Sequence, residues 1–306
     1  MGESVFTKLE GIVGEGNVVA DEPMSAHTTF EIGGPADYFV RPTTIDEVRA
    51  VVELCRATAT PLHVLGLGSD LLVADAGVRG VVMQIADNLA DIEIDAEYAV
   101  AGVGAGASNA DVAEALAAAG LAGYEFASGI PGSIGGAAIM NAGAYDGQFS
   151  DAAIEVMCLD ADLDFVRILA AEANWGYRQS RMNDEGMVVL GAVLQLASDD
   201  EAAIRARMAD LAERRASKQP LEMPSAGSTF KRPEGHFAGK LIQDAGLQGY
   251  AVGGAQVSTK HAGFVVNAGS ATAADVRQLI ADVQARVLER DGVALEPEVR
   301  MWGFDD

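Results

Sequence analysis

A glycine-rich stretch of low charge constrains the fold of this chain more than any other segment. Residues 128–147, SGIPGSIGGAAIMNAGAYDG, hold six of the 35 glycines in the chain and only one charged residue, Asp146. The stretch is not a P-loop, because no Lys-Ser/Thr pair follows its last glycine, and it lacks G-x-G-x-x-G spacing. Such bare backbone either lets main-chain amides close around an anion or lets a buried turn pack tightly. Both interpretations stay open at this point.

Composition is that of an ordinary globular protein. The chain has 306 residues, 49% hydrophobic and 22% charged, which is enough for two or three domains. No apolar run reaches the roughly 18 residues of a membrane span, and the acidic start lacks a signal-peptide pattern. Cys55 and Cys158 have apolar neighbours and are expected to be buried free thiols, which suits a reducing cytoplasm. The four histidines are scattered, so we expect no metal site.

Charge is unevenly distributed along the sequence. The net charge of −24 disfavours nucleic acid and anionic membranes as partners. The window from Arg205 to Lys260 nevertheless contains nine basic and five acidic residues, a net charge of +4. Its arginines up to Arg215 are expected on a solvated helix face. The segment STFKRPEGHFAGK is interrupted by glycine and proline and is therefore expected to form a loop, which indicates a local anion site.

Hydrophobic periodicity predicts an α+β protein of two or three domains. A capping box of Thr44 and Glu47 predicts a helix whose buried face carries Val48, Val51, Val52 and Cys55. Further helices are expected at 109–119, at 200–215 and from about Thr272 to Gly292. The last has an inner apolar stripe formed by Val276, Leu279, Ile280, Val283 and Val287.

A second glycine loop, LGLGSDLL, joins two predicted strands in the first third of the chain. Neither glycine loop opens a long helix. Two such loops that converge can hold a pyrophosphate through main-chain N–H groups, with little need for lysine or arginine. Their apolar composition also suits an aromatic cofactor ring that lies against the backbone.

Six motifs in a fixed order make a family resemblance specific. They are HTTFEIGGPADYFVRP, VLGLGSDLLVADAGVRG, GIPGSIGGAAIMNAGAYDG, YRQSRM, GSTFKRPEGHFAGKLIQDAGLQG and LEPEVRMWG. With these motifs the chain resembles the UDP-N-acetylenolpyruvoylglucosamine reductases, flavoenzymes that complete UDP-N-acetylmuramate for bacterial cell-wall synthesis. The similarity runs from about Met24 to Gly303. The short interval between YRQS and GSTF matches the compact subtype, which lacks an extra substrate-covering insertion.

The resemblance implies a fold and a reaction. The fold is an FAD-binding region of the vanillyl-alcohol-oxidase type, made of two α+β subdomains at 1–92 and 93–204, the second joined by 297–306. A C-terminal α+β substrate-binding domain then covers 205–296. The reaction reduces UDP-N-acetylglucosamine enolpyruvate with NADPH through FAD, in peptidoglycan precursor synthesis and so in cell shape and division. The protein is expected in the cytoplasm, with no nucleic acid, membrane or obligate protein partner.

Motif by motif, the resemblance also implies site residues. Main-chain contacts to FAD are expected from both glycine loops: Gly66, Leu67, Gly68, Ser69, Asp70, Leu71, Gly129, Ile130, Pro131, Gly132, Ser133, Gly135, Gly136, Asn141, Ala142 and Gly143. Asp70 departs from the family, which usually has asparagine there. A carboxylate beside a pyrophosphate is electrostatically unfavourable, which puts a direct contact from Asp70 in question.

The catalytic residues implied by the resemblance are Ser228, as the proton donor to the substrate α-carbon, and Arg178 and Glu298 beside the enolpyruvyl carboxylate. The fork of Arg178 suits a carboxylate, whereas Glu298 must be protonated, paired or an orienter in that place. Substrate contacts are expected from Tyr177, Lys218, Arg232 and His261, of which His261 is equally well explained as a structural histidine.

Two other functions are compatible with parts of the sequence. One is a sugar or hydroxy-acid oxidase with the same FAD-binding fold, which leaves the pairing of LEPEVR with GSTF unexplained. The other is a non-catalytic nucleotide-sugar sensor, which has no need for Ser228, Arg178 and Glu298 together. The presence of all three favours the reductase.

Overall fold

The computed structural model describes residues 4–304, which form two compact units. Unit 1 comprises Met1–Ala20, Tyr38–Leu67 and Gly80–Arg215, and unit 2 comprises Asp21–Asp37, Gly68–Arg79 and Ala216–Asp306. The chain passes between the units within strands β1 (Val18–Pro23), β2 (Pro35–Val40) and β5 (Val78–Gln84). The predicted division into 1–92, 93–204 and 205–296 stays a prediction.

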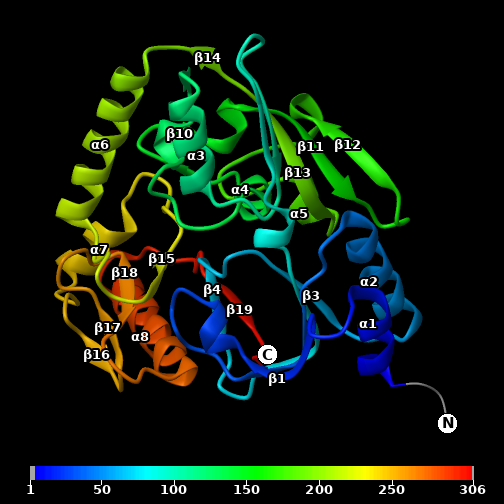
Figure 1. Ribbon diagram of the computed structural model, residues 1–306. Coiled ribbons are helices and arrows are strands. Elements are labelled where there is room, and N and C mark those ends of the chain that lie inside the picture. The colour runs from blue at the N-terminus through cyan, green and yellow to red at the C-terminus, as the bar shows by residue number, and fades with distance from the viewer. Residues whose placement is uncertain (1–3, 305–306) are drawn as a thin grey trace. The chain divides into compact units, whose positions relative to one another are not determined.

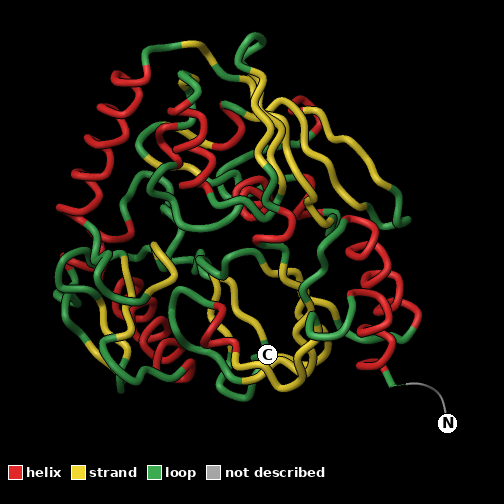
Figure 2. Tube along the Cα trace, viewed as in Figure 1, coloured by secondary structure: helices red, strands yellow, loops and turns green. Residues whose placement is uncertain are grey.

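Unit 1 is built around a five-stranded antiparallel sheet of order β12-β11-β13-β7-β6 (Figures 1 and 2). Its strands are β6 (Ile92–Asp95), β7 (Val100–Gly104), β11 (Ala153–Leu159), β12 (Phe165–Leu169) and β13 (Val188–Gln195). The central strand β13 is buried along most of its length, as expected for a strand that is covered on both faces. The short helix α4 (Ile134–Met140) contacts β13 and β7, which places the glycine-rich stretch against the core of this sheet.

Unit 1 contains further strands and helices besides this sheet. Strand β3 (Leu62–Leu65) pairs in parallel with β5, in a sheet of order β1-β2-β5-β3. Helix α1 (Val5–Val13) contacts α2 (Ile45–Ala57), and α3 (Asn109–Ala118) contacts the 3-10 turn η3 (Glu125–Ala127). The remaining elements are η2 (Asp87–Leu89), β8 (Leu121–Ala122), β9 (Gly143–Ala144), β10 (Gly147–Gln148), η4 (Phe149–Asp151), η5 (Ala170–Glu172), α5 (Arg181–Asp184), β14 (Ala197–Ser198) and α6 (Glu201–Lys218).

Unit 2 combines an antiparallel sheet with one long helix. The sheet has the order β15-β18-β17-β16, formed by β15 (Ser225–Ser228), β16 (Ala251–Val252), β17 (Ala255–Val257) and β18 (Phe264–Asn267). Helix α8 (Ala273–Asp291) packs on β16 and β17 and contacts α7 (Ala238–Asp244) (Figure 1). Strand β19 (Arg300–Trp302) pairs in parallel with β4 (Leu71–Val73), and η1 (Met24–His27) completes the unit.

The capping signals in the sequence identified two helix starts correctly. In α2 the Thr44 hydroxyl accepts the Glu47 N–H (3.2 Å), although the Glu47 carboxylate caps Thr43 (2.6 Å) rather than Thr44. In α8, Thr272 and Asp275 form a complete capping box. The apolar stripe predicted for α8 is buried, and that predicted for α2 is buried as well.

Within the described chain, no helix is long and apolar enough to cross a membrane.

Asp75 ties an early segment of unit 2 to its C-terminal helix. The Asp75 carboxylate accepts the N–H groups of Ala273 (2.8 Å) and Ala274 (3.0 Å), which are the first two of α8. Free N–H groups at a helix start are stabilised by an anion, through hydrogen bonding and through the helix dipole. The segment between β4 and β5 therefore adds a second anionic cap to the one supplied by Asp275.

We predict that Asp75→Ala lowers the free energy of unfolding by about 1 kcal/mol, the usual effect of losing a helix cap. Urea unfolding followed by circular dichroism measures this change. Glu289→Ala is the control, because Glu289 is an exposed carboxylate on α8 that accepts no hydrogen bond from any described residue. Equal stability of Asp75→Ala and Glu289→Ala would contradict the role given to Asp75.

Candidate functional site

The start of the first glycine loop lies against the second glycine loop in unit 1. The first follows β3, which ends at Leu65, and the second leads into α4, whose N-cap residue is Ser133. A Cβ added to Gly66 would lie 2.4 Å from the Ser133 Oγ. A side chain at position 66 would displace this hydroxyl, so the two loops come together at this point, as the sequence predicted.

The backbone of the second loop is fixed by the segment that leads into α3. The Asn109 N–H and the Asn109 side-chain amide both donate to the Gly132 carbonyl, each at 3.1 Å. This asparagine is 1% exposed, and its Oδ1 accepts the Tyr124 hydroxyl (2.8 Å). Two residues after Gly132, the Ile134 N–H donates to the Ala107 carbonyl (2.9 Å). The segment before α3 thus fixes the loop where it enters α4.

Some main-chain donors of this loop are used within the fold and others are not. The Gly135 N–H donates to the carbonyl that follows β7 (2.8 Å), and the Gly136 N–H donates to the Ser133 hydroxyl (3.4 Å). By contrast, the N–H groups of Gly129 and Gly132 donate to no other residue in the described part of the chain. These two N–H groups can therefore donate to oxygens of a ligand or to water.

Gly136 has no structural reason to be glycine. It lies exposed in the first turn of α4 and has an ordinary helical φ, and an added Cβ would have no neighbour closer than 3.7 Å. Glycine within a helix costs about 1 kcal/mol relative to alanine. No contact among the described residues accounts for that cost, whereas the close approach of a ligand to bare backbone does.

Arg178 occupies a strained turn. Gly176 and Gln179 exchange backbone hydrogen bonds (3.1 and 3.4 Å), so Tyr177 and Arg178 are the two central residues. Arg178 has a φ of 56°, in the left-handed region where such turns usually carry glycine or asparagine. This conformation costs about 1–3 kcal/mol unless the surroundings enforce it. The Asn141 side chain does so in part, because its Nδ2 donates to the Gly176 carbonyl (3.2 Å).

Asn141, predicted to contact FAD, uses its side chain inside the fold. The side chain also donates to Gln148 Oε1 (3.3 Å) and accepts the Ser150 N–H (3.0 Å), and the residue is 2% exposed. A cofactor contact from Asn141 therefore stays a prediction for its main chain. The same segment supports Arg178, whose Nη2 lies 3.5 Å from the Gly143 carbonyl.

Ser228 and Glu298 lie on adjacent backbone in unit 2. Ser228 ends β15 opposite Phe264 of β18, and the Glu298 N–H donates to the carbonyl of Thr229, the next residue (2.8 Å). The Ser228 side chain is exposed, and its hydroxyl makes no hydrogen bond with any residue that the structure describes. Two of the three predicted catalytic residues are thus brought together, while Arg178 belongs to unit 1.

His261 lies beside the strand that pairs with Ser228. Its ring contacts Phe264 edge to face (5.1 Å between centroids), and its Nδ1 accepts the Gly263 N–H (3.1 Å). Burial, and then the charge of Lys218, lower the pKa of His261. The hydrogen bond at Nδ1 assigns the proton of the neutral ring to Nε2, which can therefore donate to a ligand.

Two more predicted substrate residues pair a cation with an exposed aromatic ring. The Arg232 guanidinium lies 4.0 Å from the centre of the Phe237 ring, and the Arg178 guanidinium lies 4.9 Å from that of Tyr177. Tyr177 is 55% exposed and Phe237 62%. Stacking of this kind fixes the plane of a guanidinium.

Gly68, the glycine of the first loop that belongs to unit 2, is required by the fold itself. Gly68 has a φ of 62°, and a Cβ there would lie 2.0 Å from the His27 carbonyl oxygen. Directly after it, the Asp70 carbonyl accepts the Arg300 N–H (3.1 Å), and Leu71 pairs with Arg300 in the β4–β19 ladder. The FAD contacts predicted for 68–71 therefore gain no support from the glycine alone.

Arg215 corrects the expectation of a wholly solvated face on α6. Arg205, Arg207 and Arg214 are 41–51% exposed, as expected, but Arg215 is only 8% exposed. Its Nε would lie 2.8 Å from a Cβ on Gly129, and its guanidinium stands 5.6 Å from the centre of the Tyr145 ring.

Arg215 also lacks an acidic partner. No carboxylate within the described residues forms an ion pair with it, and burial lowers its pKa. A buried cation without a counter-charge is costly, which makes Arg215 a candidate for holding an anionic group. The signal for this was present in the sequence, because Arg215 continues the apolar stripe of Ile204, Met208 and Leu211 at helical spacing.

The cysteines are both free and buried, as predicted. Burial raises the pKa of Cys55 to about 11 and that of Cys158 to about 12, so neither thiol is activated. Among residues 4–304, no group of three or more His, Cys, Asp or Glu side chains could hold a metal ion.

Comparison with known proteins identifies the family. An FAD binding domain matches residues 36–168, and the C-terminal domain of UDP-N-acetylenolpyruvoylglucosamine reductase matches 219–302. The reductase of Agathobacter rectalis is 50% identical over 296 residues, which are 94% of either chain. The reductase of Clostridium botulinum strain Hall is 46% identical over 99% of this chain and 98% of its own. This chain belongs to the UDP-N-acetylenolpyruvoylglucosamine reductase family.

Solved structures agree with this assignment. The reductase of Thermus caldophilus superposes with a TM-score of 0.79 at 36% identity, over 93% of this chain and 98% of its own. A variant of Phl p 4 described as a glucose oxidase shares 16% identity at a TM-score of 0.50, over 64% of this chain and 44% of its own. The second likeness shows a common fold alone, so the oxidase alternative gains nothing from it.

Family membership confirms several predictions. These are the reductase family, the α+β fold class, and an FAD-containing oxidoreductase that uses NADPH in peptidoglycan precursor synthesis. The residues present also fit FAD, because the second loop offers the Gly129 and Gly132 N–H groups and the bare backbone of Gly136. The individual site residues stay predictions.

We predict that Gly136→Val yields a folded protein without bound flavin. A Cβ at position 136 has no close neighbour in the described chain, so the fold should tolerate the substitution. A loss of flavin would then mean that the new side chain occupies space that the ligand needs. Flavin absorbance of the purified protein and its thermal unfolding curve measure the two properties separately. Gly102→Val is the control, because a Cβ on this β7 glycine also meets nothing within 4 Å. Normal flavin content in Gly136→Val would contradict the role of this loop surface.

We also predict that His261 makes the protein less stable in mild acid. The folded state holds the pKa of His261 below its ordinary value of about 6.5, so the unfolded chain takes up the proton first as the pH falls. The free energy of unfolding should therefore decrease as the pH falls from 6.5 towards the folded pKa, and His261→Gln should lose that part of the decrease. Urea unfolding at pH 7.5 and pH 5.5 tests this, with exposed His236→Gln as the control. An unchanged pH dependence in His261→Gln would refute it.

Proposed function

We propose that this chain reduces UDP-N-acetylglucosamine enolpyruvate to UDP-N-acetylmuramate with electrons from NADPH, using Ser228, Arg178 and Glu298 as its catalytic residues. The reaction rests on membership of the reductase family over nearly the whole chain. For the residues, the observation that carries most weight is that the exposed Ser228 directly precedes Thr229, whose carbonyl accepts the Glu298 N–H. FAD, when bound, supplies hydride transfer from NADPH to the enolpyruvyl double bond.

Ser228 supplies the proton that completes the reduction. Hydride addition at the β-carbon moves an electron pair towards the α-carbon and its carboxylate, and a proton must then reach the α-carbon. The Ser228 hydroxyl is exposed and makes no hydrogen bond with another described residue, so it can face a substrate. Serine is a weak acid, so it needs a neighbour that stabilises its alkoxide or returns the proton. The fold brings Glu298 close to it, because the Glu298 N–H donates to the carbonyl of Thr229, the residue after Ser228.

Arg178 holds the substrate carboxylate. Negative charge accumulates there during the reaction, and a guanidinium fork binds a carboxylate through two parallel hydrogen bonds. The strained turn supports this role, because a left-handed arginine is retained only where its surroundings hold it in place. Its Nη2 lies at the edge of hydrogen-bonding distance from the Gly143 carbonyl, and its plane is set by Tyr177.

The nucleotide end of the substrate is bound by cations of unit 2. Lys218 and Arg232 both belong to the basic window, and both are exposed. They suit the two phosphates of the UDP group, which the rest of this acidic chain repels. Neutral His261, with its proton on Nε2, adds a hydrogen-bond donor near Lys218. Tyr177 adds an exposed aromatic ring on the side of Arg178.

We place the reaction in the cytoplasm, with small molecules as the only necessary partners. Free buried cysteines suit a reducing compartment. The net charge of −24 opposes binding to nucleic acid and to anionic membranes. No obligate protein partner is needed for the residues named above to act.

We predict that Ser228→Ala separates the two halves of the reaction. Reduction of the flavin by NADPH needs no acid at the substrate α-carbon, so bleaching of the flavin in a rapid-mixing experiment should be normal. Turnover with the enolpyruvyl substrate should fall by about 10²–10⁴-fold, the usual effect of losing a general acid. Ser225→Ala is the matched control, since it makes the same chemical change three residues earlier on β15.

The control should turn over normally. Normal turnover in Ser228→Ala, or a defect confined to flavin reduction, would remove Ser228 from this role and make Glu298 the next candidate. A wild-type protein that binds FAD but oxidises a sugar with oxygen would refute the reductase proposal itself.

A further inference from the structure

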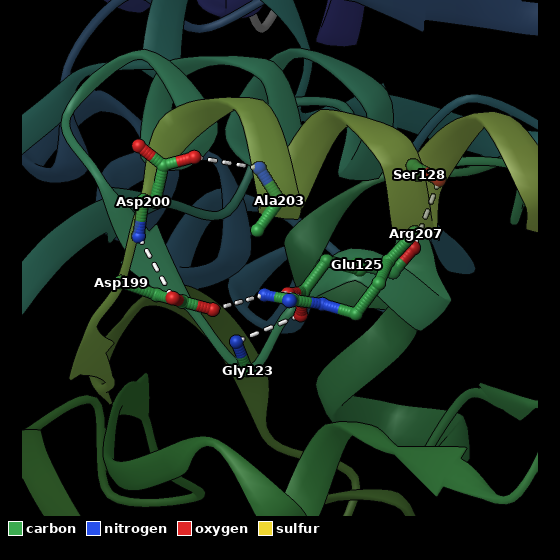
Figure 3. A network of polar contacts seen from close by, with 7 residues as sticks. All are labelled: Gly123, Glu125, Ser128, Asp199, Asp200, Ala203 and Arg207. Atoms are coloured by element: carbon green, nitrogen blue, oxygen red, sulfur yellow. Dashed lines mark hydrogen bonds and ion pairs between the residues drawn. The ribbon is translucent and has the colours of Figure 1, made fainter.

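One arginine of α6 joins three segments of unit 1. The Arg207 guanidinium donates to Glu125 Oε1 from Nε (2.9 Å) and from Nη2 (2.7 Å), and its Nη2 also donates to Asp199 Oδ2 (2.7 Å). Figure 3 shows Arg207 lying between the two carboxylates, which come from η3 and from the segment before α6. We refer to Glu125, Asp199 and Arg207 as the Arg207 bridge. It connects α6 with the residues directly before the second glycine loop.

Glu125 is the part of the bridge that reaches the loop. Its other carboxylate oxygen accepts the Gly123 N–H (2.8 Å), and its main-chain carbonyl accepts both the N–H (3.1 Å) and the hydroxyl (2.8 Å) of Ser128. Ser128 is the first residue of the glycine-rich stretch, followed by Gly129. Movement of Glu125 would therefore be transmitted directly to the start of the loop.

The pair of Arg207 and Glu125 is partly shielded from water. The Glu125 side chain is 12% exposed, against 39% for Asp199 and 45% for Arg207. Burial alone would raise the pKa of Glu125, but hydrogen bonds from the main chain and from Arg207 outweigh it and hold this pKa below its ordinary range. Ion pairs with a shielded member and two-fold contacts are stronger than ordinary surface pairs.

The same helix also reaches the loop further on. Arg215 follows Arg207 by eight residues, which is about 12 Å along the helix axis and about a quarter-turn round it. There it lies against Gly129 and the ring of Tyr145, buried and without an acidic partner in the described chain. The bridge at Arg207 thus fixes the helix that carries the buried cation, and it fixes the loop that this cation contacts.

We propose that Glu125 and Arg207 are positioning residues for the cofactor, which set the second glycine loop and Arg215 relative to each other before FAD binds. This inference rests on the proposed function, because it takes FAD as the ligand of the loop. It assigns no contact between the bridge and the cofactor. The bridge acts through Ser128, Gly129 and Arg215, so its loss should weaken FAD binding more than it weakens the fold.

The chain provides a matched control on the same helix. Arg205 forms an ion pair with Glu114 of α3 (2.8 Å) and a second one with Glu201 (2.7 Å). Its exposure is 41%, close to that of Arg207, but it contacts neither η3 nor the glycine loop. Arg205→Lys and Arg207→Lys therefore both remove a guanidinium from α6. Only Arg207→Lys removes one that is hydrogen-bonded to Glu125, directly before the glycine loop.

The test is a titration of apoprotein with FAD, followed by quenching of flavin fluorescence, together with thermal unfolding of the apoprotein. We expect the dissociation constant for FAD to rise at least about tenfold in Arg207→Lys and to stay within about twofold of wild type in Arg205→Lys. The two variants should lose similar thermal stability without FAD. Glu125→Gln, which keeps the shape of the side chain, should resemble Arg207→Lys, and the double variant should add little to either single one.

Equal dissociation constants in Arg207→Lys and Arg205→Lys, with wild type binding FAD normally, would overturn this inference and leave the proposed function intact. Fully additive effects of Glu125→Gln and Arg207→Lys would also overturn it, because the two residues would then act independently. If Arg207→Lys does not fold, Glu125→Gln with Glu114→Gln as its control decides the question by the same measurement. A wild-type apoprotein that binds no FAD would overturn the proposed function, and this inference with it.

Discussion

The antiparallel bridge between Ser108 and Ser133 is the interaction on which the candidate cofactor loop depends. Glycine has more conformational freedom to lose on folding than any other residue, so a glycine-rich loop is ordered only where its main chain is held. Here the start of α3 holds it, through the bridge and through the buried Asn109 side chain. The N–H groups left uncommitted at Gly129 and Gly132 thereby gain fixed directions before any ligand arrives. A site that is ordered in advance loses less entropy on binding.

Local signals explain what could be predicted from the sequence. The helix from Thr272 to Gly292 combines a capping box, a continuous apolar stripe and a glycine that ends it at a φ of 68°, and each of these depends on residues close in sequence. The glycine loops and the LEPEVRMWG motif were recognised because their motifs are contiguous and ordered. The family could therefore be named from the sequence, and so could the α+β class.

Features that depend on distant contacts could not be predicted in this way. The spacing of Arg215 continues the apolar stripe of α6, but only the structure shows that Gly129 and the Tyr145 ring lie against its guanidinium. The left-handed turn at Arg178 could not be predicted locally, because position 178 carries neither glycine nor asparagine. The residue that holds the turn, Asn141, is remote in sequence. Gly68 shows why a glycine alone does not indicate a ligand, because the carbonyl of His27 already requires glycine there.

The parallel pairing of β4 with β19 has a consequence for how the protein folds as it is synthesised. Arg300 pairs with Leu71, so one strand of this ladder leaves the ribosome long before the other. Closing so long a loop is entropically costly and slow, and it cannot begin until the last residues are available. The early segments of unit 2, Asp21–Asp37 and Gly68–Arg79, must wait for the C-terminus, whereas nearly all of the sheet of unit 1 is complete by Gln195. The order of synthesis thus favours assembly of unit 1 first, with β19 as the closing strand of unit 2.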